Sequence, residues 1–106
     1  MNIIWTDRAD ELKNEIADYI LVNFGKTARK NFLTEVYETV LLLAKHPFMG
    51  KVEPFLEDRP QTYRSFVINH INKVVYRAEE DRIVVVAIWN CRRDPKTLVA
   101  QVDDLP

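Results

Sequence analysis

Residues 63–96 constrain the fold most, because they contain three strand-like runs joined by two short polar turns. The first run, residues 63–70, alternates between two sets of side chains, and the second covers residues 73–78. The third, residues 83–89, is apolar at every position, which is typical of a strand that is buried on both faces. Period-two alternation and β-branched residues favour strands, so this stretch predicts a small antiparallel sheet.

The residues before this stretch predict one further strand and two helices. Residues 2–5 (NIIW) form a short β-branched and aromatic run, and Thr6 or Asp7 can cap a helix that follows. Gly25 predicts the end of that helix, and Thr27 opens a second one that must stop before Pro47. A link this short folds two helices into an antiparallel hairpin.

The remaining segments leave one question open. Residues 51–62 contain two prolines and mixed charges, which predicts a loop with little regular structure. The tail after Pro95 suits either a turn of helix or a short edge strand. Two helices cover only one face of the sheet, so the second face needs either this tail or a bound partner. The prediction is one α+β domain over residues 1–106, ordered β-α-α-β-β-β.

Charge is divided unevenly along a chain whose net charge is only −1. Residues 59–96 hold eight Lys and Arg against four Asp and Glu, whereas residues 1–58 hold seven against ten. A basic half of this kind hints at a polyanionic partner. Cys91 is the single cysteine, and its local sequence favours a partly buried thiol. Without a signal peptide or a long apolar run, we expect a cytoplasmic protein.

Several kinds of site are excluded by composition. The chain has only two glycines, so it has no glycine-rich phosphate loop. One cysteine and the separated His46 and His70 do not have the spacing of a zinc site. No Ser/His/Asp arrangement is visible in the sequence, and we expect neither a metal nor a cofactor.

The chemistry that remains is a set of cations on the predicted sheet. Arg64 and Lys73 lie on neighbouring strands, and Arg92 follows the last one. Guanidinium groups bind phosphate through paired hydrogen bonds and stabilise charge in phosphodiester cleavage. The alternative is that these cations only solubilise the sheet or pair with acids such as Glu79. These three, together with Arg93, Arg77 and Lys96, are therefore candidates for a phosphate-binding patch.

The order of these segments resembles the RelE/ParE superfamily, the toxins of bacterial type II toxin–antitoxin modules, which include plasmid stabilisation proteins. The resemblance covers nearly the whole chain. It is carried by the strand and helical hairpin, the His-Pro turn at residues 46–50, the valine-rich strands, and the Arg-Arg-Asp-Pro run at residues 92–95.

The resemblance implies a toxin held inactive by a cognate antitoxin, with one of two activities. RelE-like members cleave messenger RNA on the ribosome, and their basic residues fall on Arg64, Lys73 and Arg92. The resemblance therefore implies that these three are the candidate catalytic residues. A second basic residue and a late tyrosine of that pattern fall on Phe66 and near Leu98, where this sequence departs from it. ParE-like members inhibit DNA gyrase. The leading hypothesis is a ribosome-dependent mRNA endonuclease; the alternatives are a gyrase inhibitor and a toxin fold without activity.

Overall fold

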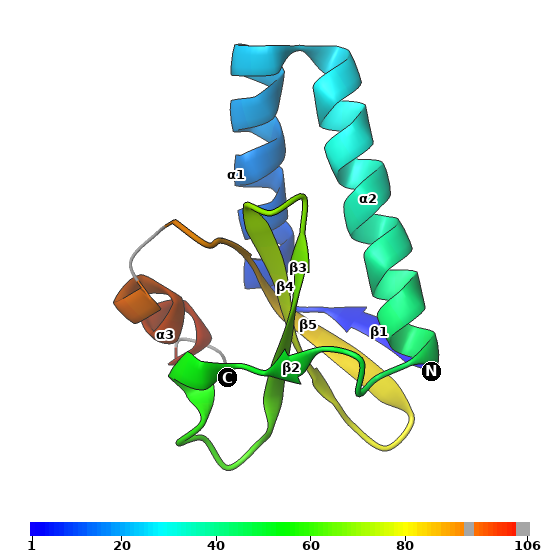
Figure 1. Cartoon of the computed structure of the whole chain (residues 1–106), viewed down its shortest axis with the longest axis vertical. Coiled ribbons are helices and arrows are strands. Elements are labelled where there is room, and N and C mark those ends of the chain that lie inside the picture. Colours follow the sequence, from blue (N-terminus) through cyan, green and yellow to red (C-terminus); the bar gives the residue numbers. More distant parts are fainter. Residues whose placement is uncertain (93–94, 104–106) are drawn as a thin grey trace.

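A five-stranded mixed sheet in the order β1-β5-β4-β3-β2 forms the centre of the structure (Figure 1). The structure is a computed structural model that describes residues 1–92 and 95–103. Strand β1 pairs in parallel with β5, and the other neighbours are antiparallel. The strands are β1 (Asn2–Trp5), β2 (Lys51–Val52), β3 (Tyr63–Ile68), β4 (Asn72–Ala78) and β5 (Arg82–Asn90). The predicted α+β class is confirmed.

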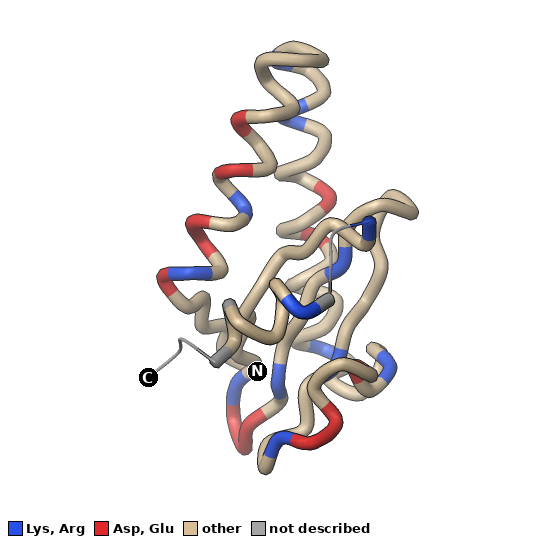
Figure 2. Tube along the Cα trace, turned by 90° about the vertical axis from the view of Figure 1, so that its left-hand side faces the viewer, with Lys and Arg blue, Asp and Glu red and all other residues tan. Residues whose placement is uncertain are grey.

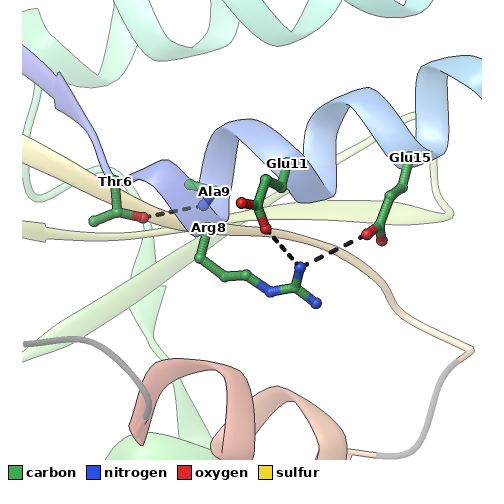
Figure 3. A network of polar contacts seen from close by, with 5 residues as sticks. All are labelled: Thr6, Arg8, Ala9, Glu11 and Glu15. Atoms are coloured by element: carbon green, nitrogen blue, oxygen red, sulfur yellow. Dashed lines mark hydrogen bonds and ion pairs between the residues drawn. The ribbon is translucent and has the colours of Figure 1, made fainter.

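Two helices, α1 (Asp7–Phe24) and α2 (Lys26–Lys45), form an antiparallel hairpin on one face of the sheet (Figure 1). Thr6 caps α1, because its Oγ1 accepts a hydrogen bond of 3.0 Å from the amide of Ala9 (Figure 3). In the next turns Arg8 joins Glu11 and Glu15 by ion pairs of 2.9 and 3.6 Å. The cap and the hairpin agree with the sequence prediction.

The second face of the sheet is covered by the chain's own C-terminal helix, α3 (Pro95–Asp103), which lies opposite the hairpin (Figure 1). Leu98 and Val102 of this helix are buried in one apolar cluster with Trp89 of β5. Leu56 joins the same cluster from a 3₁₀ helix, η1 (Pro54–Leu56). The open question about the second cover is therefore answered by the tail, which forms a helix.

A bulge between β4 and β5 adjusts the side chains to these two covers. Val75 pairs with Ala87, but the next residue, Tyr76, pairs with Val85, so Val86 has no partner on β4. As a result Val86 and Ala87 both lie in the cluster beneath α3, whereas Val85 lies in the core beneath the hairpin. Both faces of β5 are buried in this way, as its unbroken apolar sequence predicts.

One expectation needs detail and another needs correction. The sequence predicts little regular structure for residues 51–62, and they contain a two-residue strand, β2, and a three-residue 3₁₀ helix, η1. The proline at position 54 opens the 3₁₀ turn, and the burial of Leu56 holds that turn on the sheet. Cys91 is exposed, not partly buried, because it lies in the turn after β5. Among the described helices, none is long and apolar enough to cross a membrane.

Candidate functional site

Arg64 lies near the start of β3 and reaches the turn that follows α2. Its Nη1 donates a hydrogen bond of 2.9 Å to the carbonyl of Gly50. The guanidinium carbon also lies 5.2 Å from the centre of the Phe48 ring. A guanidinium over an aromatic face is attracted by the ring electrons, so both contacts fix the side chain. Arg64 is therefore held in place, with a planar group half-exposed at the end of the sheet.

The turn beneath Arg64 is held from the other side by Tyr76 of β4. The tyrosine hydroxyl donates to the carbonyl of Pro47 at 2.7 Å and accepts from the amide of Gly50 at 3.1 Å. Burial raises the pKa of Tyr76, which keeps the hydroxyl protonated as a donor. A Cβ on Gly50 would lie 2.7 Å from this hydroxyl and 2.9 Å from the carbonyl of Ser65. Only glycine fits between them.

A second arginine, Arg77, comes from the neighbouring strand β4. Its guanidinium carbon lies 6.0 Å from the centre of the Tyr63 ring, and its Nε is 3.6 Å from Glu79. The hydrogen bond from Arg82 lowers the pKa of Glu79, and the charges of Arg82 and Arg77 add to this shift. Glu79 is therefore a carboxylate at neutral pH.

Arg64 and Arg77 line one pocket at this end of the sheet, with a volume of 430 Å³. Phe48 forms one wall, and the loop before β3 and the end of β4 form the rest. The full lining is Phe48, Gln61, Thr62, Arg64, Arg77, Ala78 and Glu79. We call this the arginine pocket. In the described part of the chain, this pocket contains two cations, one carboxylate and no histidine.

Lys73, the second candidate catalytic residue, lies on the other face of the sheet and outside the arginine pocket. Its Nζ forms an ion pair of 2.7 Å with Glu53, whose side chain is fully buried, and Phe55 packs 5.6 Å from the ammonium. Only 13% of the Lys73 side chain is exposed. The structure therefore shows Lys73 joined to an internal carboxylate.

Arg92, the third candidate, lies at the opposite end of the sheet from Arg64. Strand β4 pairs Tyr76 with Arg64 and Asn72 with Asn90, so these two positions are about 13 Å apart along the strand. Arg92 comes two residues after Asn90 and is exposed. Its backbone amide donates a hydrogen bond of 2.8 Å to the side-chain oxygen of Asn90. Of the other expected phosphate contacts, Lys96 is exposed on α3 and Arg93 lies outside the described residues.

Sequence reasoning missed the groups that hold these cations. Glu53 sits in a proline-flanked segment that gives no sign of burial, and Phe48 and Tyr76 carry no charge. One indication of such a group is present in the sequence, because Glu79 is an acid with which the basic residues could form ion pairs. Within the described residues no group of His, Cys, Asp or Glu is placed to hold a metal ion.

Comparison with known proteins identifies the family. The family model for the "ParE toxin of type II toxin-antitoxin system, parDE" matches residues 3–95. This chain belongs to the ParE toxin family. A solved structure titled "Chromosomal ParDE TA system from P. aeruginosa" is similar to this ParE-family chain, with a TM-score of 0.69 and 20% sequence identity. The match covers 85% of this chain and 95% of the other and concerns the fold. No curated protein sequence matches.

The resemblance to the RelE/ParE superfamily is thereby confirmed, and membership of the ParE family implies a cognate antitoxin. The structure also shows how this ParE-family chain fills the two positions where it departs from the RelE-like pattern. Phe66 packs against the core beneath the helical hairpin. Leu98 is fully buried in the cluster beneath α3. Both positions serve the packing of the sheet.

Proposed function

We propose that this toxin inhibits DNA gyrase by binding to it, and that it does not cleave RNA. The observation that carries the proposal is the separation of the three candidate catalytic cations. Arg64 contacts the turn after α2, Lys73 lies on the other face of the sheet in an ion pair with Glu53, and Arg92 lies at the other end of the sheet. A phosphodiester in its transition state needs cations that converge on one group.

The described residues around Arg64 also lack a suitable pair of groups for proton transfer. RNA cleavage by the 2′-hydroxyl needs a general base and a general acid within hydrogen-bond reach. Among the described residues Glu79 is the only acid that lines the arginine pocket, and its lowered pKa makes it a poor proton donor at neutral pH. Membership of the ParE toxin family supports the same conclusion, since the ParE-like branch of the superfamily is the one whose resemblance implies gyrase inhibition.

A supercoiling assay tests the proposal directly. Purified toxin is added to DNA gyrase, ATP and relaxed plasmid, and the supercoiled fraction is measured against the toxin-to-gyrase ratio. We expect inhibition that follows the amount of toxin bound and is reversed by the cognate antitoxin. In parallel, toxin is added to ribosomes translating a defined messenger RNA, and we expect the RNA to stay intact.

Arg92→Ala separates the two mechanisms further. A nuclease that uses Arg92 for charge stabilisation would cut messenger RNA at amounts far below the ribosome concentration, and Arg92→Ala would slow that cleavage by roughly 100-fold or more. Cleavage with this dependence, together with unimpeded supercoiling, would overturn the proposal and restore the mRNA endonuclease.

A further inference from the structure

The arginine pocket has the donors for an oxyanion that the gyrase proposal does not use. A guanidinium has five N–H donors, and among the described contacts Arg64 spends one of them, on the carbonyl of Gly50. Arg77 meets Glu79 only at 3.6 Å from its Nε. Two guanidinium groups from neighbouring strands thus line one pocket, and several of their N–H donors have no described acceptor.

Both arginines are ordered before any ligand arrives. Arg64 is fixed by Gly50 and Phe48, and Arg77 packs against Tyr63. Immobilising a long side chain on binding costs free energy, so side chains that are already fixed bind a partner at lower entropic cost. The planar, bidentate geometry of guanidinium matches a carboxylate or a phosphate equally well.

The charges around the pocket favour a single carboxylate over a nucleic acid. Glu79 lines the pocket beside the arginines, and it repels a dense run of phosphates. The whole chain carries a net charge of −1, and Figure 2 shows acidic positions interleaved with basic ones along the backbone. Nucleic-acid binding relies on a continuous basic surface, and the described lining of this pocket places a carboxylate beside its two arginines.

The apolar wall of the pocket also suits a protein. Phe48 is 72% exposed, although its ring lies against Arg64. Aromatic and arginine side chains together are enriched at the energetically important centres of protein interfaces. An acidic side chain flanked by an apolar one would meet both the arginines and the exposed face of Phe48.

We propose that the arginine pocket receives a carboxylate side chain of the cognate antitoxin, next to an apolar side chain that packs on Phe48. The proposal rests on the assignment of the chain as a toxin and not on gyrase as its target. Binding of a carboxylate to a paired, partly desolvated guanidinium is charge-assisted and geometrically specific. This contact would make antitoxin affinity sensitive to each arginine.

The test measures the affinity of the toxin for its purified cognate antitoxin, by isothermal titration calorimetry. We expect Arg64→Gln and Arg77→Gln each to weaken binding by about tenfold or more. Arg29→Gln removes the same group from an exposed position on α2 and is the matched control, with binding unchanged. Glu79→Gln removes the competing carboxylate, so it should tighten binding by about threefold.

Two further measurements keep a folding defect apart from a lost contact. Thermal unfolding checks each variant, because Arg64 also supports the turn at Gly50. Arg64→Lys keeps the positive charge but loses the planar, bidentate guanidinium group. We expect this variant to bind the antitoxin more weakly than wild type while remaining folded. The gain expected for Glu79→Gln cannot arise from misfolding.

Specific results would overturn the proposal. One is that Arg64→Gln and Arg77→Gln bind the antitoxin as tightly as Arg29→Gln does. Another is that they keep this affinity but lose binding to a single-stranded RNA probe, which would assign the pocket to phosphate. The titration contains no gyrase, so its result does not depend on whether the toxin inhibits gyrase. The supercoiling assay of toxin alone likewise does not depend on whether the arginine pocket binds the antitoxin.

Discussion

Burial decides what each of the predicted cations can do. Arg64 and Lys73 both lie in strand-like runs of the sequence, yet Arg64 lines a pocket and Lys73 contacts a buried acid. Within the described residues, Oε2 of Glu53 has no hydrogen-bond partner, so that carboxylate depends on Lys73 for its stabilisation. Taking both charges out of water is costly, and the ion pair only partly repays that cost.

This ion pair gives a test at the scale of one residue. Lys73→Met leaves the Glu53 carboxylate buried and unpaired, and we expect it to lower the free energy of unfolding by about 3 to 5 kcal/mol. The double variant Lys73→Met/Glu53→Leu removes both charges and should recover most of that loss. Urea unfolding followed by tryptophan fluorescence measures both variants.

Lys51→Met is the matched control, because Lys51 is exposed on β2 and its loss should change stability little. If Lys73→Met were no less stable than Lys51→Met, the buried pair would not matter to the fold. A double variant less stable than Lys73→Met would show that leucine cannot fill the space beneath η1.

At the scale of elements, the sequence predicted what local signals determine. Thr6, Gly25 and Pro47 delimit the two helices through caps and a missing amide, and these act within a few residues. Helix α3 and η1 depend instead on distant contacts, since Leu98 and Leu56 become buried only against β5 and its neighbours. A tail of this length is marginal as an isolated helix, so its sequence could not decide its structure.

The register between strands was the other feature that the sequence did not predict. This register explains why the three candidate catalytic cations lie apart. The sequence predicts a strand-like run over residues 63–70, but β3 ends at Ile68 and the next two residues, Asn69 and His70, are left-handed, with φ of 44° and 63°. These conformations set the pairing of Arg64 with Tyr76 and of Val67 with Lys73. Alternation within one strand could not show which cations share a face across strands.

The link between α1 and α2 gives a prediction at this scale, because a single residue, Gly25, separates the helices. Its φ of 94° and ψ of 179° lie in a region that is open almost only to glycine, although nothing lies within 4 Å of an added Cβ. Gly25→Ala should therefore lower the free energy of unfolding by about 1 to 3 kcal/mol through backbone strain alone. Thr27→Ala, at an exposed position on α2, is the control; equal stabilities would mean that the hairpin relaxes without cost.

At the scale of the whole molecule, Lys13 joins the N-terminal strand to both helices of the hairpin. Its Nζ donates to Asp10 of α1 and to Tyr37 of α2, both at 2.7 Å, and lies 5.1 Å from the centre of the Trp5 ring of β1. Burial alone would lower the pKa of Lys13, but the hydrogen bonds to Asp10 and Tyr37 outweigh it, and the net shift is upward from 10.5. The folded state therefore holds this proton more tightly than the unfolded chain does.

This shift ties the stability of the fold to alkaline pH. Below the unfolded value of about 10.5 both states are protonated, and the contribution of Lys13 to stability is complete. As the pH rises further the unfolded chain loses its proton first, so this contribution declines until the raised folded pKa is passed.

Urea unfolding between about pH 9 and pH 12 should show a steeper loss of stability for wild type than for Lys13→Met. Lys30→Met, on the exposed surface of α2, should follow the wild-type slope, because tyrosine ionisation and the other groups are common to all three proteins. Parallel slopes for wild type and Lys13→Met would show that Lys13 loses its proton equally easily in both states, and that the junction of β1, α1 and α2 depends on apolar packing alone.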